Sequence, residues 1–258
     1  MLLDEHFLVS IISGIFIGAA SGYLGSLMVL RRMALVGDAL SHVALPGMGL
    51  ALVFSINPFI GAFIFLVLAV FAIWALELKT KIPTEALVGV MFTGSLALGL
   101  LITPDAEILE ALFGDISRIT LIEGIVISVI SILLIIFTRL IYKKSILGII
   151  SFDLAKSKGI KLEKYNFFYL IFVAIIVALG IKMIGTLLMG ALVILPAVAS
   201  KNIARNLTVF SCFAIVIGVI STAVGLFISR FFYFSPGPIV VLLAVAIFLV
   251  TLFFRTKN

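Results

Sequence analysis

An aspartate and a histidine, Asp38 and His42, stand four residues apart inside a long apolar run. On a helix, this spacing places both side chains on the same face, one turn apart. Ionisable side chains within apolar spans are energetically costly and commonly functional. A carboxylate and an imidazole together suit Zn²⁺, Mn²⁺ or Fe²⁺ and are poor ligands for Cu⁺. The pair is therefore a candidate metal site.

Two ligands are too few for a complete site. A second copy of the chain, related by a two-fold axis, would raise the number to four, and two-fold homodimers are the commonest oligomers. The alternative is a structural polar clamp, in which Asp38 and His42 pair with each other or with Ser41 and the backbone. The single cysteine, Cys212, excludes a Cys-rich zinc site. Metal site and clamp both remain open at this point.

The residues that follow the pair predict a break in its helix. Pro46, Gly47 and Gly49 come directly after His42. Proline removes a helical hydrogen bond, and the glycines loosen the helix further. A broken helix beside buried ligands is how transporters expose a site to both sides of a membrane.

The elements that hold this pair must be membrane spans, because lipid is the main solvent of the chain. Hydrophobic residues make up 64% of the 258 residues and charged residues 12%, and the mean hydropathy is +1.39. A soluble domain carries roughly 25% charged residues. In lipid the spans must be helical, because the backbone finds no other partners. We therefore predict an all-α, polytopic transmembrane helical bundle that forms one domain over residues 1–258.

Apolar runs between charged or Pro/Gly residues predict the individual spans. They fall near residues 7–30, 33–56, 59–76, 84–103, 120–142, 165–184, 186–200, 207–229 and 236–254. A full crossing needs about 20 residues. The run 186–200 is short by this measure, so the bundle has eight or nine spans.

The basic residues predict how the bundle lies in the membrane. If the N-terminus faces outward, all of the 18 Lys and Arg residues except Arg118, Lys182 and Arg230 fall on the cytoplasmic side. This follows the positive-inside rule and favours nine spans with a cytoplasmic C-terminus. The net charge of +6 is thus a topological signal and requires no nucleic acid partner. The acidic outer connection 105–115 is either a solvated amphipathic helix or a docking surface that attracts cations.

The longest inner connection, 143–164, is predicted to contain a short helix. Ser151 can cap it, Asp153 lies in its first turn, and Gly159 can end it. Such a helix at the cytoplasmic surface is either a contact for a soluble partner or merely interfacial. The chain has no G-x-x-x-x-G-K-[ST] phosphate-binding pattern. If ATP drives this protein, a separate subunit must hydrolyse it.

Several segments, in order along the chain, resemble the permeases of zinc, manganese and iron ABC importers. They are Leu30–His42, Leu112–Ile116, Ser151–Gly159, Gly190–Ala197 and Ser235–Val240. The resemblance implies a homodimeric, cobalamin-importer-like (type II) ABC permease in the cell membrane of a prokaryote. It implies two cytoplasmic ATPase subunits and an extracellular solute-binding protein as partners. The transported substrate would be Zn²⁺, Mn²⁺ or Fe²⁺, with no permanently bound cofactor.

The same resemblance assigns roles to individual residues. The family's metal-contacting Asp-x-x-x-His falls on Asp38 and His42. Its coupling helix, which inserts into the ATPase, falls on the inner loop, and the matching residues are Ser151, Phe152, Asp153, Ala155 and Gly159.

Two other functions are compatible with an intramembrane Asp and His. A proton-coupled secondary metal transporter would use Asp38 as its proton carrier, and would need no ATPase. An intramembrane hydrolase would require a nucleophile or paired carboxylates with a base, which Asp38 and His42 alone fit poorly.

Overall fold

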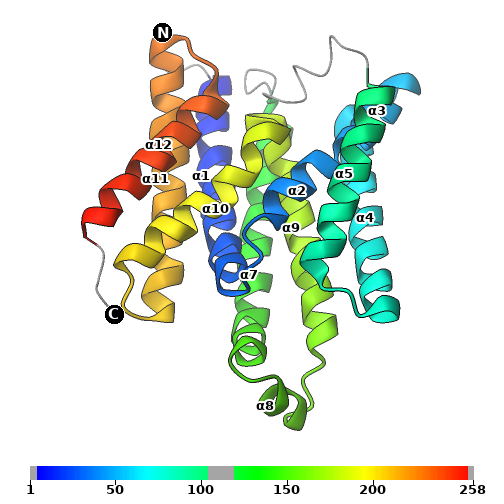
Figure 1. The fold of residues 1–258 in the computed structure, drawn as a ribbon. Coiled ribbons are helices and arrows are strands. Elements are labelled where there is room, and N and C mark those ends of the chain that lie inside the picture. Colours follow the sequence, from blue (N-terminus) through cyan, green and yellow to red (C-terminus); the bar gives the residue numbers. More distant parts are fainter. Residues whose placement is uncertain (1–4, 104–118, 255–258) are drawn as a thin grey trace.

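The computed structural model describes residues 5–103 and 119–254, and every regular element in these ranges is a helix. The helices in chain order are α1 (Glu5–Leu30), α2 (Val36–Val43), α3 (Leu45–Val53), α4 (Pro58–Thr80), α5 (Thr84–Ile102), α7 (Leu121–Ile150), α8 (Phe152–Ser157), α9 (Leu162–Ile184), α10 (Thr186–Ile203), α11 (Leu207–Phe232) and α12 (Pro236–Phe253). This arrangement confirms the predicted all-α bundle (Figure 1). The acidic connection 105–115 lies outside the described residues.

Eight segments of the described chain are long and apolar enough to cross a membrane, with α2 and α3 together forming one of them. The remaining long helix, α10, has a shorter apolar stretch, Leu188–Ile203. It nevertheless runs from the end of the bundle where α9 finishes to the end where α11 begins (Figure 1). The eight spans and α10 thus agree with the prediction of eight or nine.

The two ends of the bundle differ in charge. Helix α8 projects beyond the other helices at one end, here called the α8 end (Figure 1). Because successive spans alternate in direction, the basic pairs Arg31–Arg32, Lys79–Lys81 and Lys143–Lys144 all lie toward this end. Lys182, which the sequence placed on the opposite side, forms an ion pair with Glu123 that joins α9 to α7 at the other end.

Helix α1 is the centre of the bundle and packs against α7, α10 and α11. Small residues allow these helices to approach closely in lipid. At Gly18, a Cβ atom would lie 2.5 Å from the carbonyl oxygen of Gly218 on α11, so only glycine fits this contact. Of the 18-residue apolar stretch that represents each span, 61% of the residues are buried in α1, but 28% in α4 and 22% in α5. Helices α4 and α5 therefore present most of their surface to the surroundings.

The inner connection is more helical than predicted. We expected a span to end near residue 142 and a loop to follow over 143–164, whereas α7 continues to Ile150 and α9 already begins at Leu162. Lysines do not end a helix, because their long apolar stems can lie along it while the charge reaches water. With 30 residues, α7 is about 45 Å long, which exceeds the roughly 30 Å apolar core of a bilayer.

Candidate functional site

The candidate ligands lie on a short helix that ends at a break. Helix α2 ends at Val43 and α3 begins at Leu45, with Pro46 in its first turn. Pro46 has no N–H group, so the carbonyl oxygen of His42 lacks its regular helical donor. The N–H of Ala44 donates to this oxygen instead. The break predicted from Pro46 is confirmed.

Asp38 lines a cavity of about 200 Å³ between α2 and α5. The cavity walls are formed by Leu35, Val36, Asp38, Ala39, Glu85, Val88, Gly89 and Phe92. Asp38 is half-buried, and its main-chain oxygen accepts a hydrogen bond of 2.7 Å from the Ser41 hydroxyl. A carboxylate on the wall of a small, mostly apolar cavity is a suitable first contact for a cation.

His42 lies one helical turn beyond Asp38 and is also half-buried. Its ring packs 5.5 Å, centroid to centroid, from the ring of Phe92, which lines the same cavity. The Nδ1 atom is enclosed and has no hydrogen-bond partner within the described residues. Across residues 5–103 and 119–254, no hydrogen bond or ion pair joins Asp38 to His42, so the direct clamp between them is not formed.

Helix α10 fixes the position of Asp38 from the other side. A Cβ atom on Gly190 would lie 2.3 Å from the Cα atom and 2.6 Å from the Cβ atom of Asp38. The backbone of α10 therefore rests directly on the backbone of α2 at the candidate ligand. Gly190 therefore has a packing role, because its missing side chain lets α10 approach Asp38.

The described residues of one chain supply too few ligands for a metal ion. Within the part of the chain that the structure describes, no three His, Cys, Asp or Glu side chains come together. Asp38 and His42 are thus two candidate ligands on one chain. A metal site built on them would need further ligands, and the completion of the site by a second copy stays a prediction.

Sequence reasoning missed the position of Glu85. Glu85 stands at the start of a predicted span, and its side chain is exposed. It also lines the Asp38 cavity, from the first turn of α5. The sequence carries no signal that α5 pairs with α2, so only the fold reveals this second carboxylate.

Sequence reasoning also missed a polar network at the α8 end, centred on Asn166 of α9. The Asn166 side-chain oxygen accepts a 2.6 Å hydrogen bond from Arg31 Nη1. Its Nδ2 atom donates to the Glu77 carboxylate at 3.0 and 3.2 Å and to the Thr84 hydroxyl at 3.1 Å. Arg31 Nη2 also donates to Ser145 Oγ at 3.2 Å.

This network, comprising Arg31, Glu77, Thr84, Ser145 and Asn166, connects five parts of the bundle. Arg31 follows α1 and precedes α2, and the other four residues of the network come from α4, α5, α7 and α9. The Arg31 guanidinium also lies 4.7 Å from the ring centre of Tyr169. Burial lowers the pKa of Arg31, whereas Tyr169 and Glu77 favour its charged form. Both Nη atoms of the buried charge are thus hydrogen-bonded, whereas the Nε atom has no hydrogen-bond partner within the described residues.

Helix α8 has the local structure expected from its sequence. The Ser151 hydroxyl accepts a 3.2 Å hydrogen bond from the N–H of Leu154, Asp153 lies in the first turn, and Gly159 has a positive φ of 69° after the last turn. Ala155 is buried against the rest of the chain, whereas Phe152 is 62% exposed. An exposed phenylalanine on a projecting helix is an apolar contact that a partner protein could cover.

The chain is similar over its whole length to permeases of bacterial metal import systems. It is 32% identical to the manganese import system permease protein ScaB of Streptococcus gordonii, across 100% of this chain and 94% of that protein. It is 31% identical to the high-affinity zinc uptake system membrane protein ZnuB of Haemophilus influenzae, across 96% of this chain and 97% of that protein.

Solved structures share the fold. PsaBC from Streptococcus pneumoniae, in complex with Fab, superposes with a TM-score of 0.85 at 25% identity, covering 98% of this chain and 93% of that chain. A metal-chelate type ABC transporter in an inward-facing conformation gives a TM-score of 0.78 at 15% identity, covering 96% and 85%. The model of the ABC 3 transport family matches residues 4–255. The chain is therefore a member of the ABC 3 transport family and a membrane subunit of an ABC transporter.

Proposed function

We propose that the chain is the permease subunit of an importer for Mn²⁺ or Zn²⁺, with Asp38 and His42 contacting the ion. The observation that carries the proposal is the position of this O,N ligand pair just before a helix break, with Asp38 lining a cavity and His42 packed on Phe92 of its wall. The relatives described above are named for manganese and for zinc. Iron, which the ligand types also allow, has no comparable support. Membership of an ABC transport family argues against proton-coupled secondary transport.

In the proposed mechanism, two copies of the chain meet about a two-fold axis, and each contributes Asp38 and His42. The Asp38 carboxylates offset part of the cost of removing water from the ion. The His42 imidazoles favour Mn²⁺ or Zn²⁺ over Ca²⁺ and Mg²⁺, which prefer all-oxygen shells. Alternating access follows when the position of α2 changes between an outward-open and an inward-open state.

We assign the α8 end of the bundle to the cytoplasm, because it carries the basic residues. This orientation decides which partner can reach each end of the chain. The N-terminus then faces outward, where an extracellular solute-binding protein delivers the ion. Helix α8, with Ser151, Phe152, Asp153, Ala155 and the adjacent Gly159, would contact a cytoplasmic ATPase dimer that hydrolyses ATP. ATP-driven movement of the ATPases would reach the permease through α7 and α9, which flank α8.

The first prediction tests the ligand pair. Asp38→Ala and His42→Ala should each reduce uptake of radioactive manganese or zinc to background, because two of the four ligands disappear from the dimer. His6→Ala is the matched control, since His6 is the other histidine of the chain. Uptake is measured in cells or proteoliposomes that contain the complete importer, and assembly is checked by size-exclusion chromatography. Wild-type uptake by both variants would refute the proposed site.

A further inference from the structure

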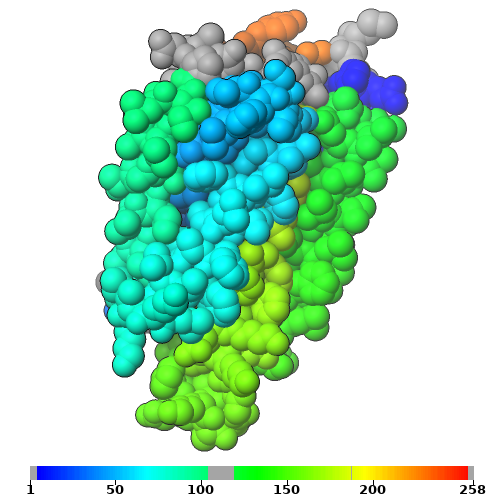
Figure 2. Space-filling view, turned by 90° about the vertical axis from the view of Figure 1, so that its right-hand side faces the viewer, coloured from blue at the N-terminus to red at the C-terminus, as the bar shows by residue number. Residues whose placement is uncertain are grey.

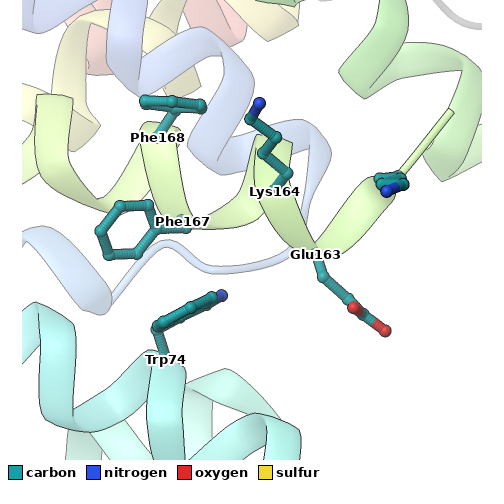
Figure 3. Close-up of a pocket in the computed structure, with 6 residues that line it drawn as sticks. Trp74, Glu163, Lys164, Phe167 and Phe168 are labelled. Carbon is teal, nitrogen blue, oxygen red and sulfur yellow. The ribbon is translucent and has the colours of Figure 1, made fainter.

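A second cavity, of about 380 Å³, lies between α4 and α9 near the α8 end. Figure 2 shows the face of the molecule on which α9 appears between α4 and α7. Trp74 of α4 and residues from the start of α9 form the walls, and Figure 3 shows them together. The lining residues are Trp74, Lys161, Glu163, Lys164, Phe167 and Phe168.

One part of this cavity is aromatic. The ring of Phe167 packs 4.9 Å from Trp74 and 5.9 Å from Phe168, measured between centroids. Figure 3 shows Phe167 facing Trp74 across the space between the two helices. Phe168 is 38% exposed, so this aromatic surface is accessible to a ligand. Tryptophan, such as Trp74 here, is enriched where membrane spans meet the headgroup region.

The other part is basic. Lys161 and Lys164 are exposed, and the Lys164 ammonium lies 5.8 Å from the ring centre of Phe168. Glu163 is the one acid among the lining residues, and Figure 3 shows its carboxylate directed away from Lys164. Within the described part of the chain, neither lysine forms an ion pair. Their charges are therefore available to an anionic ligand.

The depth of the cavity indicates where its ligand comes from. Trp74 lies six residues before the end of α4, which is about 9 Å along the helix axis. Lys161 and Lys164 stand at the start of α9, which lies at the same end of the bundle as the end of α4. The aromatic part thus reaches the acyl region of the bilayer, whereas the lysines lie at the headgroups. A soluble anion would leave the aromatic part uncovered, but a phospholipid covers both.

We propose that this cavity binds an anionic phospholipid. Lys161 and Lys164 would contact the phosphate and the net negative headgroup, and Phe167, Phe168 and Trp74 would contact the glycerol and the first acyl carbons. Basic pockets between spans on the cytoplasmic side suit such headgroups, and each nearby lysine contributes about 1 kcal/mol, or about fivefold in affinity. A zwitterionic lipid gains less, because its own cation competes with the lysines.

The site adjoins the part of the protein that is proposed to contact the ATPase. Lys161 lies four residues after the last residue of α8, and the intervening connection includes Gly159. A bound headgroup would restrain this connection and hence the position of α8. We expect the rate of coupled transport to depend on anionic lipid. The binding itself does not depend on the transported substrate, so it can be tested separately from the proposed function.

The chain offers a built-in probe, because Trp74 is its single tryptophan. The full-length protein is reconstituted in vesicles in which a fixed fraction of the lipid carries brominated acyl chains, which quench nearby tryptophan. The brominated lipid is phosphatidylglycerol in one series and phosphatidylcholine in the other. We expect Trp74 quenching to show at least about a fivefold preference for phosphatidylglycerol.

Matched variants locate the preference. The double variant Lys161→Gln/Lys164→Gln should bring the preference close to one. The control Lys79→Gln/Lys81→Gln removes the same charge from exposed lysines at the same end, outside the cavity, and should retain the preference. Glu163→Gln should increase the preference, because it removes the opposing carboxylate. Millimolar inorganic phosphate should leave the quenching unchanged if a lipid, and not a soluble anion, is the ligand.

Equal quenching by the two lipids would overturn the proposal. So would equal loss of the preference in both double variants, which would indicate a diffuse basic surface and not a site. Loss of ATPase association in Lys161→Gln/Lys164→Gln, with its lipid preference intact, would assign this face to the ATPase. A change of oligomeric state with intact lipid preference would assign it to a second copy of the chain.

Discussion

At the scale of single residues, Gly190 has the most direct effect on the candidate ligand Asp38. The contact is backbone against backbone, so no flexible side chain can move aside for an added atom. Gly37, the neighbour of Asp38 on α2, is different. A Cβ atom there would have its nearest neighbours, in Met28 and Val193, at 3.5 and 3.6 Å, which is ordinary van der Waals contact.

This difference gives a second prediction. Gly190→Ala should reduce metal uptake at least about tenfold, because a Cβ atom 2.3 Å from Asp38 Cα must push α2 away from α10. Gly37→Ala should retain most of the uptake, although it stands next to Asp38. Uptake by the complete importer and the amount of assembled permease are measured in parallel. Similar uptake by the two variants would show that the α2–α10 contact does not position Asp38.

At the scale of elements, the Asn166 network holds the start of α2 to the helices that flank α8. Asn166 lies near the start of α9 and Ser145 near the end of α7. Both accept a hydrogen bond from Arg31, and Asn166 also donates one to Glu77 of α4. Arg31, their shared partner, is seven residues before Asp38. A displacement of α8 would therefore reach α2, which carries the candidate ligands, through side chains that are hydrogen-bonded across helices.

The third prediction concerns the removal of the Asn166 side-chain amide, which is the centre of the network. Asn166→Ala leaves Arg31 and Glu77 without their bridge, at a cost of about 1–3 kcal/mol for unsatisfied buried groups. The thermal unfolding temperature should fall, and ATP hydrolysis by the complete importer should continue with less metal moved per ATP. Arg32→Gln, next to Arg31 but exposed, is the control. Unchanged transport per ATP in Asn166→Ala would exclude a coupling role for the network.

At the scale of the whole molecule, the outward face of α5 is the surface on which a second copy could complete the site. Gly89 lines the Asp38 cavity, and a Cβ atom there would meet nothing within 4 Å. Thr93 and Ala97 continue the same face at four-residue spacing and are exposed. A partner seated here would lie beside the cavity that Asp38 lines.

The fourth prediction concerns this surface. In a Cys212→Ser background, which removes the single cysteine, Thr93→Cys or Ala97→Cys should form a cross-linked dimer with a short bifunctional reagent in membranes. Ile136→Cys on α7, which is 50% exposed, should stay monomeric on a denaturing gel. Cross-linking of Ile136→Cys but not of the α5 variants would place the second copy on a different face.

The apolar runs predicted the spans well, because in lipid each span must satisfy its own backbone and its length is set by the bilayer. Pro46 predicted the break beside Asp38, and Ser151 predicted the start of α8, since both act within a few residues of themselves. The position at which α7 ends was predicted wrongly, because Lys143 and Lys144 mark the edge of the membrane but do not interrupt the helix, which continues to Ile150. Glu85 and Asn166 were missed because their importance depends on which helices pack together, and no local pattern carries that information.

The shortness of α2 has a consequence for how an ion would be released. Its eight residues form a rod of about 12 Å, bounded by the Arg31–Leu35 turn at one end and by the break at Ala44 at the other. A tilt of this rod would carry Asp38 and His42 together without changing the spacing between them. In the proposed dimer, the distance between the two α2 helices would then determine how tightly the ion is bound. Release would require the two helices to move apart, and neither helix would have to unwind.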